Sequence, residues 1–249
     1  MTDSETPVVA TLADALGVGP DDLTCVVGAG GKKSLIYRLG RSLDGVVTST
    51  VRIPIFDGEV AEVVVSDDPV TVVEETVVRP LGVVPERERP DRYRGYEPTT
   101  VAAVARATDD VVLTKADGAR SRWLKAPADH EPRLPDNTDL VCPIASAHVV
   151  GEPLDDERVH RPELVSEITG TELGDPLSAW DVAATLASDR GGLKGVPETA
   201  RVVPVINMVD GDEQEATAEE IAGFVREHPR VERVVATRLV AEDPVVALY

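Results

Sequence analysis

The alternation of apolar and polar segments along the chain predicts an α/β fold. Short runs of valine and other aliphatic residues, typical of buried strands, lie at 23–27, 46–51, 111–114, 139–145, 202–206 and 232–236. Between them, apolar residues at helical spacing predict helices over 8–18, 32–43, 99–107, 161–169, 176–188 and 216–227. Strands that alternate with helices favour a mostly parallel sheet in a three-layer arrangement, which we expect residues 1–249 to form as a single domain.

Residues 54–98 interrupt this pattern. The segments VAEVVVSD and VTVVEETVV alternate like exposed β-ribbons, and VVPERERPDRYRGYEP is rich in proline and charge. We interpret this part of the chain as a small β-rich insertion or lid, made of antiparallel strands and loop, within the larger domain.

The first candidate site is the glycine-rich turn after the strand at 23–27. It leads into the helix at 32–43 and reads Gly28-Ala29-Gly30-Gly31-Lys32-Lys33-Ser34. Backbone N–H groups in such a turn can surround a phosphate, the helix N-terminus favours an anion, and Lys32 can neutralise the outer phosphates. The turn predicts a fold of the P-loop NTPase type that binds ATP or GTP. The alternative is a turn that only lets strand and helix pack closely, although two lysines at a helix N-terminus oppose the helix dipole unless an anion is present.

A Mg²⁺ ion that accompanies the nucleotide would be held by Ser34 and Asp117. The usual spacing GxxxxGK[ST] is shortened to GxxGK, and Lys33 stands where a hydroxyl normally meets Mg²⁺, so Ser34 is the best hydroxyl available. Asp117 follows the strand at 111–114 and is placed to hold Mg²⁺ or to orient a water. Because Gly118 follows it, Asp117 can also belong to an ordinary turn.

Basic residues gather downstream of Asp117. We expect catalytic roles for Asp117, Lys125 and His130, the last as an acid or a base. A second anion site, opposite the glycine-rich turn, is expected from Arg120, Arg122, His160, Arg161 and Lys194. The alternative is a loop stiffened by proline whose charges are solvated.

A further motif, Asn207-Met208-Val209-Asp210, comes directly after the strand at 202–206. In GTP-binding folds, an Asn-Lys-x-Asp sequence at this point reads the base. We therefore expect Asn207 and Asp210 to read the base, although both residue types are also common in turns.

The charge balance narrows the functional classes. The 249 residues carry 45 Asp plus Glu against 25 Lys plus Arg, a formal net charge of −20. The electric field of such a negative molecule repels polyanions, which argues against a protein that coats DNA or RNA. Only five of the basic residues are lysines, at positions 32, 33, 115, 125 and 194. This composition suggests a halophilic protein in a salt-rich cytosol, where salt screens self-repulsion, with an ordinary acidic protein as the alternative.

The remaining composition predicts a cytoplasmic protein with no membrane partner. Cys25 and Cys142 lie in apolar surroundings without the spacing of a zinc site, so we expect buried, reduced thiols. The N-terminal segment MTDSETPVVA is acidic, and no apolar run approaches the roughly 18 residues of a membrane span.

Five segments together resemble a known protein family. They are VVGAGGKKS (26–34), ADGARSRWLKAPADHEPRLP (116–135), GEPLDDERVHRPELVSEITG (151–170), GGLKGVPETAR (191–201) and VINMVD (205–210). In this order they resemble the accessory proteins of selenium-dependent molybdenum hydroxylases, also called selenium cofactor biosynthesis proteins of the YqeC type. Relative to that family's pattern, Lys33 replaces a hydroxyl residue, Lys115 a Glu and Met208 a Lys. These departures put metal-assisted hydrolysis and guanine preference in question.

The resemblance implies a protein that binds a nucleoside triphosphate with Mg²⁺ and takes part in maturation of a molybdenum hydroxylase cofactor. Its partners would be the hydroxylase or its cofactor-maturation proteins. On this hypothesis the chain hydrolyses the triphosphate or transfers a phosphoryl group. The alternative is a noncatalytic nucleotide sensor or scaffold whose segment 54–98 docks the hydroxylase or a partner nucleotidyltransferase.

Overall fold

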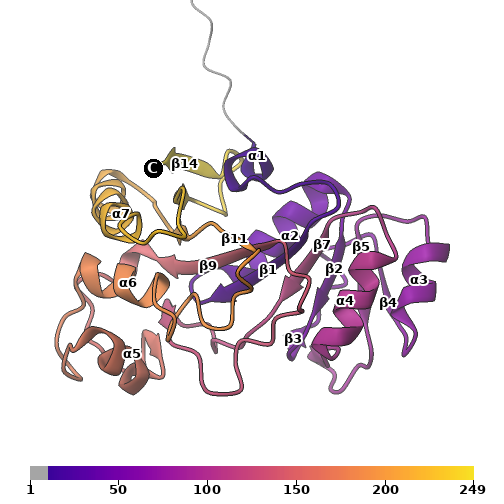
Figure 1. Ribbon diagram of the computed structural model, residues 1–249, viewed down its shortest axis with the longest axis horizontal. Coiled ribbons are helices and arrows are strands. Elements are labelled where there is room, and N and C mark those ends of the chain that lie inside the picture. Colours follow the sequence, from indigo (N-terminus) through magenta and orange to yellow (C-terminus); the bar gives the residue numbers. More distant parts are fainter. Residues whose placement is uncertain (1–10) are drawn as a thin grey trace, which may run out of the picture.

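The computed structural model describes residues 11–249 and contains a central β-sheet with helices on both faces (Figure 1). The strands of this sheet are β1 (Leu23–Gly28), β2 (Val46–Ser49), β4 (Glu62–Val65), β5 (Leu81–Val84), β7 (Val112–Lys115), β9 (Leu140–Ser146), β11 (Arg201–Val202), β12 (Val205–Asn207), β13 (Val235–Thr237) and β14 (Val245–Leu248). Their order is β14-β13-β12-β9-β1-β7-β2-β5-β4, with β11 beside β9. The pairing of β13 with β14 is antiparallel and the others are parallel, which confirms the mostly parallel α/β class.

Two short two-stranded sheets lie outside the central sheet. In one, β3 (Ile53–Pro54) runs antiparallel to β6 (Arg92–Tyr93). In the other, β8 (Leu124–Lys125) runs parallel to β10 (Val159–His160). Each ribbon supplies residues to the candidate site described below.

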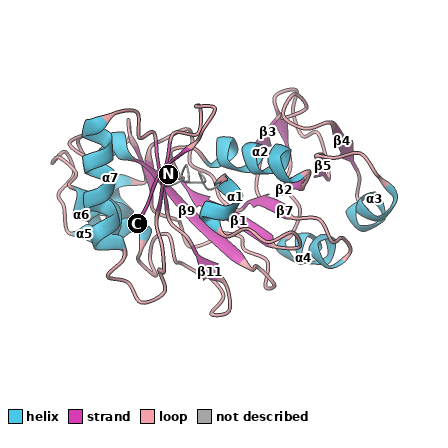
Figure 2. Cartoon of the chain, turned by 90° about the horizontal axis from the view of Figure 1, so that it is seen from above, coloured by secondary structure: helices cyan, strands magenta, loops and turns pink. Residues whose placement is uncertain are grey.

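The helices are α1 (Leu12–Leu16), α2 (Lys32–Leu43), α3 (Pro69–Glu75), α4 (Pro98–Arg106), α5 (Pro162–Thr169), α6 (Ala179–Leu186) and α7 (Asp212–Val225). Side chains of β1 alternate between two cores: Val26 packs in a cluster with residues of α1 and α2, whereas Cys25 and Val27 pack with residues of α5, α6 and α7. Figure 2 shows α2 and α4 on opposite sides of β1 and β7. Because both faces of the sheet are covered, its inner strands β1, β2, β7 and β9 are buried along almost their whole length and are mainly apolar.

The expected antiparallel insertion at 54–98 is wrong. Strands β4 and β5 pair parallel with each other, and β5 pairs parallel with β2, so they extend the central sheet. The segment between them is helix α3, which begins after Asp68, whose side chain accepts a hydrogen bond from the backbone N–H of Thr71. Its valines alternate in sequence as a strand would, but the proline at its first turn and the Asp cap favour a helix. Antiparallel pairing in this region is limited, within the described residues, to β3 with β6 and an isolated bridge between Arg89 and Arg92.

Smaller differences concern the ends of elements. The strand expected at 202–206 divides into β11 and β12 around Pro204, which has no backbone N–H to donate. Strand β14 was not predicted, and of the helix expected at 8–18 the structure contains α1, with residues 8–10 outside the described part of the chain. Among residues 11–249, no helix has both the length and the apolar character that crossing a bilayer requires.

Candidate functional site

A cleft of about 780 Å³ opens at the carboxyl ends of β1 and β7. After β1 the chain crosses to β2 on one side, and after β7 it crosses to β9 on the other side. Open α/β sheets commonly bind ligands at such a reversal of strand order. Within residues 11–249, one acidic residue, Glu131, lines the cleft. Eight basic residues line it: Lys32, Lys33, Arg52, Arg92, Lys115, Arg120, Arg122 and Arg161. The cleft is therefore strongly cationic in a chain whose net charge is −20.

The glycine-rich turn forms one wall of this cleft. Residues 29–34 line it, and α2 begins there at Lys32 without an acidic residue in its first turn. The turn is fixed by the Gly30 N–H, which donates to the Arg122 carbonyl at 2.9 Å, and by the Gly30 carbonyl, which accepts from Asn207 Nδ2 at 2.7 Å. Gly30 has φ of 86°, and a Cβ there would lie 2.6 Å from the Ser146 nitrogen, so the turn requires glycine at this position.

A buried chain of alternating charges runs behind the turn. Asp117 Oδ1 lies 2.8 Å from Lys32 Nζ, and Asp117 Oδ2 lies 3.1 Å from Lys125 Nζ. Lys125 Nζ lies in turn 2.7 Å from Glu131 Oε2, which also meets Arg161 Nη1 at 2.8 Å. Each carboxylate also accepts a hydrogen bond from a backbone N–H group: Gly28 donates to Asp117, and Gly118 donates to Glu131. The two acids thus hold the glycine turn, the loop after β7 and the start of α5 together.

These contacts shift the pKa values of groups in the cleft. Burial would raise the pKa of Glu131, but the hydrogen bond and charge of Lys125 outweigh it and lower that pKa to about 2. Burial, followed by the charge of Lys32, lowers the pKa of Lys115 to about 7. An anion in the cleft would favour the protonated form of Lys115, whose Nζ donates to the Arg52 carbonyl at 3.0 Å. Burial and the charges of Arg161 and Lys125 lower the pKa of His160 to about 4, so its imidazole is neutral at neutral pH.

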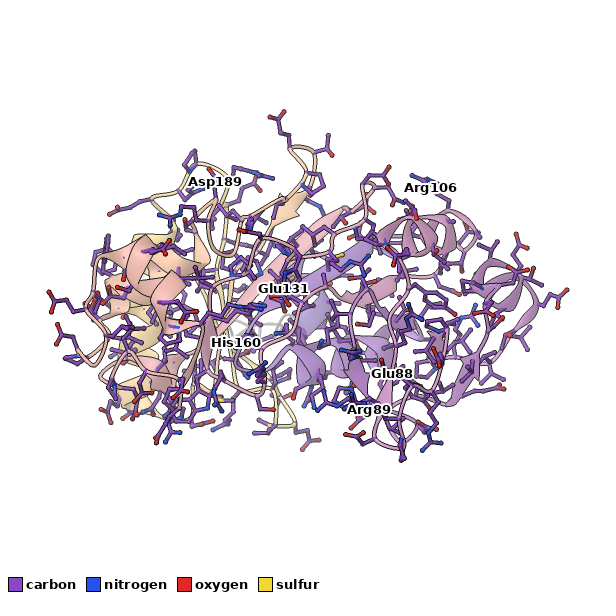
Figure 3. The ribbon with its side chains drawn as sticks, turned by 90° about the horizontal axis from the view of Figure 1, so that it is seen from below. Glu88, Arg89, Arg106, Glu131, His160 and Asp189 are labelled. Carbon is purple, nitrogen blue, oxygen red and sulfur yellow. The ribbon has the colours of Figure 1, made fainter. Side chains whose placement is uncertain are left out.

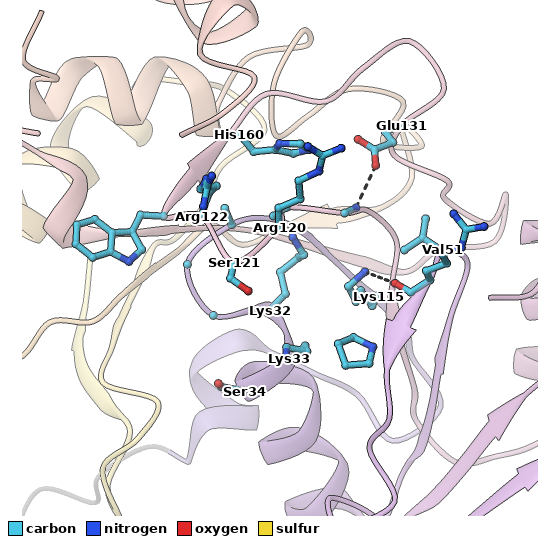
Figure 4. Close-up of a pocket in the computed structure, with 18 of the residues that line it drawn as sticks. Lys32, Lys33, Ser34, Val51, Lys115, Arg120, Ser121, Arg122, Glu131 and His160 are labelled. Atoms are coloured by element: carbon cyan, nitrogen blue, oxygen red, sulfur yellow. Dashed lines mark hydrogen bonds between the residues drawn. The ribbon is translucent and has the colours of Figure 1, made fainter. Parts of the chain in front are cut away.

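The wall opposite the glycine turn is formed by Arg120, Ser121, Arg122, His160 and Arg161. Figure 4 shows Arg120, Arg122 and His160 across the cleft from Lys33 and Ser34. Three of these residues have left-handed backbones, with φ of 48° at Arg120, 61° at Ser121 and 64° at Arg161. Among residues 11–249, the other non-glycine residues with positive φ are Asp44 and Met208, and Met208 also lines the cleft. Non-glycine residues in this region cost roughly 1–3 kcal/mol each and concentrate at functional sites.

The C-terminal motif is arranged differently from the expectation. Asn207 is buried, its amide nitrogen bonds the glycine turn, and its Oδ1 accepts from the Thr237 hydroxyl and the Leu239 N–H at 3.1 Å each. We therefore assign Asn207 to holding the turn in place, because its polar groups are already engaged. Asp210 is exposed and lies 2.9 Å from His148 Nε2. Reading of a base by Asp210 stays a prediction.

The structure places some of the predicted catalytic and second-site residues in the cleft lining and others outside it. His130 lines the cleft but is exposed, whereas Lys125 is buried in the charge chain and is absent from the lining of the cleft as described over residues 11–249. Lys194 lies away from that lining as well and donates to the Ala128 carbonyl at 2.8 Å. Sequence reasoning missed Glu131, whose only signal was its position between the basic residues of 120–133. Figure 3 shows Glu131 and His160 near the middle of the molecule.

The donors present do not fit Mg²⁺ at the expected position. Asp117 is 1% exposed, and its Oδ2 meets Lys125 and the Gly28 N–H. Its Oδ1 makes no hydrogen bond but lies 2.8 Å from the Lys32 ammonium. Ser34 offers an exposed hydroxyl next to Lys33, and in the part of the chain that is described no cluster of three or more His, Cys, Asp or Glu could hold a metal ion. A dication would have to displace a buried lysine and then lie beside other ammonium groups.

Comparison with known proteins identifies the family. The family model described as YqeC protein matches residues 24–163, more than half of the chain, and this range contains both walls of the cleft described above. The chain is also similar to the Escherichia coli (strain K12) protein named "Uncharacterized protein YqeC", with 29% identity over 228 residues that cover 84% of this chain and 89% of that relative. The chain therefore belongs to the YqeC protein family.

Proposed function

We propose that this protein binds a nucleoside triphosphate, ATP or GTP, in the cleft beside the glycine turn. On this proposal it acts as an accessory protein in maturation of a molybdenum hydroxylase cofactor, selenium-dependent or not. The observation that carries the proposal is the concentration of eight basic residues and one acidic residue around a glycine turn at a helix N-terminus. Such an arrangement recognises clustered negative charge, of which a polyphosphate is the common small-molecule form.

The size and position of the cleft support a nucleotide-sized ligand. Its volume of about 780 Å³ falls within the range of roughly 300–1,000 Å³ that is usual for small-molecule pockets. The glycine turn, with Lys32 and Lys33, would hold phosphates, as in a P-loop fold. Trp123 and Met208, which also line the cleft, offer apolar surface for the rest of the ligand.

Both walls of the cleft carry cations, so the cleft could hold two anionic substrates and allow transfer of a phosphoryl group between them. Arg120, Arg122 and Arg161 would hold the second anion opposite the glycine turn. One observation favours the alternative, a nucleotide sensor without turnover: the carboxylates of Asp117 and Glu131 are engaged by lysine and arginine, and neither is available as a general base. The exposed His130 and the neutral imidazole of His160 are the remaining histidine candidates for an acid or base in the cleft wall.

The test of nucleotide binding is a thermal-shift series with ATP, GTP and their diphosphates at high KCl concentration. A ligand present at 100 times its Kd stabilises the folded state by about 2.7 kcal/mol, which corresponds to a Tm increase of roughly 5–10 °C for a chain of this length. Lys33→Gln should reduce that increase, because Lys33 is exposed in the cleft wall. Arg190→Gln, which removes an exposed cation paired with Glu167, is the matched control. No shift with any nucleotide would contradict the proposal.

Two further measurements separate the alternatives within the proposal. Release of phosphate in the presence of bound nucleotide supports an enzyme, whereas bound nucleotide without release, even with a candidate partner present, supports the sensor. For the cellular role, deletion of the gene should lower molybdenum hydroxylase activity and leave molybdenum enzymes of other classes active. Unchanged hydroxylase activity would overturn the maturation role while leaving nucleotide binding intact.

A further inference from the structure

We infer that the cleft selects a polyphosphate that carries no Mg²⁺, and that Lys32, Lys33 and Lys115 neutralise it in place of the metal. This inference rests on the proposed function, since it concerns the form of the phosphate ligand. It differs from the expectation drawn from the sequence, in which Mg²⁺ binds between Ser34 and Asp117.

The first argument is the number of cations at the phosphate end of the cleft. Lys32 and Lys33 begin α2, and Lys115 ends β7, so that three ammonium groups from two elements line the same wall (Figure 4). Lys32 and Lys115 are 5% and 6% exposed. Buried charges are screened little by salt, so Lys32, and Lys115 once an anion favours its protonated form, attract that anion even in a salt-rich solvent.

The second argument is the state of the nearby carboxylates. A metal-bound triphosphate usually needs one or two protein carboxylates or hydroxyls to complete the coordination of Mg²⁺. Asp117 meets Lys32, Lys125 and the Gly28 N–H, and Glu131 meets Lys125, Arg161 and the Gly118 N–H. Each oxygen therefore already has a cation or an N–H group as its partner.

Together these features favour the more highly charged form of the ligand. A triphosphate without its metal carries more negative charge than the Mg²⁺ complex and gains more from three ammonium groups. The Mg²⁺ complex would bring a dication towards the same groups and meet repulsion. The chain thus discriminates between two states of one ligand by charge.

The experiment is isothermal titration calorimetry of the full chain in molar KCl with tripolyphosphate and with ATP. Each ligand is titrated once with EDTA and once with MgCl₂ in excess of the ligand. We expect the apparent affinity for both ligands to be at least tenfold lower with MgCl₂. Sulfate, which binds Mg²⁺ weakly, should displace the ligand with the same inhibition constant in both solutions. A parallel change for sulfate would show that Mg²⁺ acts on the protein itself, and would overturn the inference.

Variants test whether the lysines cause the discrimination. Lys33→Gln should lower the affinity for metal-free tripolyphosphate about tenfold and change the affinity for the Mg²⁺ complex less, so that the ratio of the two affinities falls. Lys115→Gln should act in the same direction. Lys33 is exposed, so Lys33→Gln keeps the test available if Lys115→Gln does not fold. Arg190→Gln changes the net charge equally at a distant ion pair and should leave the ratio unchanged.

The outcomes separate this inference from the proposed function. Tighter or equal binding with MgCl₂ overturns the inference and leaves the proposed function standing. A ratio that is the same in Lys33→Gln and in the unmodified chain also overturns it. The absence of binding in every solution overturns both.

Discussion

The cleft and the rest of the molecule carry opposite charges. Within residues 11–249 the cleft is lined by eight Lys or Arg residues and one acidic residue, whereas the other described residues include 17 Lys or Arg and 42 Asp or Glu. The acidic exterior is a property of the whole surface and suits a salty solvent, whereas the cations are gathered at one edge of the sheet. The difference teaches that in this chain the exceptions to the average composition mark the candidate site.

The two regions also differ in how their charges are paired. Exterior pairs such as Arg41 with Glu59 and Arg190 with Glu167 join half-exposed side chains, and pairs of this kind contribute little stability. Asp117 and Lys125, by contrast, are almost fully buried and form part of a continuous chain of charges. Removing one member there leaves a buried charge without its partner, so the comparison predicts very unequal effects of mutation.

The largest expected effect is that of Asp117→Asn. This change removes the anion shared by Lys32 and Lys125, and breaking a buried ion pair in this way costs about 3–5 kcal/mol. The free energy of unfolding should fall by that amount, as measured by urea denaturation at high KCl. Asp109→Asn, at an exposed position, is the matched control. Equal losses in the two variants would break the comparison between cleft and exterior.

A somewhat smaller and pH-dependent effect is expected for Glu131→Gln. Because the pKa of Glu131 is lowered to about 2 in the folded chain from 4.5, its ion pairs stabilise the fold above about pH 4.5. That stabilisation, roughly 3 kcal/mol at most, should disappear as the pH falls from 4.5 towards 2. Unfolding of the two proteins across this pH range measures it. A constant difference at all pH values would show that the charge of Glu131 is not responsible.

The next effect concerns ligand affinity. Arg122→Ala should weaken binding of the nucleotide or tripolyphosphate by about ten- to a hundredfold, since hydrogen bonds to charged groups contribute about 1.5–3 kcal/mol. The Arg122 carbonyl, which accepts from Gly30, is retained in this variant. Calorimetric titration compares it with Arg226→Ala, an exposed position at the end of α7. Similar losses in both variants would indicate attraction by overall charge and not by the cleft wall.

The smallest effect is expected at an exterior ion pair. Arg41→Gln should change the free energy of unfolding by less than about 1 kcal/mol, because Arg41 and Glu59 are about half exposed and screened by solvent. A double-mutant cycle with Glu59→Gln isolates the pair. A coupling energy as large as that between Asp117 and Lys125 would mean that burial does not distinguish the two regions.

The sequence predicts those parts of the fold whose residues are neighbours along the chain. The glycine turn could be located because strand, turn and helix are contiguous over 23–43. Helix α3 was missed because its valines alternate as in a strand, although the pair Asp68-Pro69 is a helix-start signal that was available. The parallel pairing of β4 with β5 follows from that helix, since a parallel connection requires a crossover.

The site was predicted less completely than the fold because its key contacts join distant residues. Asn207 is 177 positions from Gly30, whose carbonyl it binds, and no local pattern reveals that distance. Glu131 and His130 are adjacent, and only the three-dimensional structure shows that the Glu is buried among cations while the His faces solvent. Residue type identified the basic cluster, and burial decides which members reach the cleft.

The cleft is lined almost entirely by the first two thirds of the chain, and this has a consequence for how the sequence can diverge. Over residues 11–249, Met208 is the sole lining residue that follows Arg161. Helix α5 meets the candidate site through Arg161, the residue before its first turn, whereas α6 and α7 touch it only indirectly, through Asn207 and the packing of β12. The outer surfaces of α6 and α7 are under no direct constraint from the ligand, so they can change from one organism to another while the cleft is inherited intact.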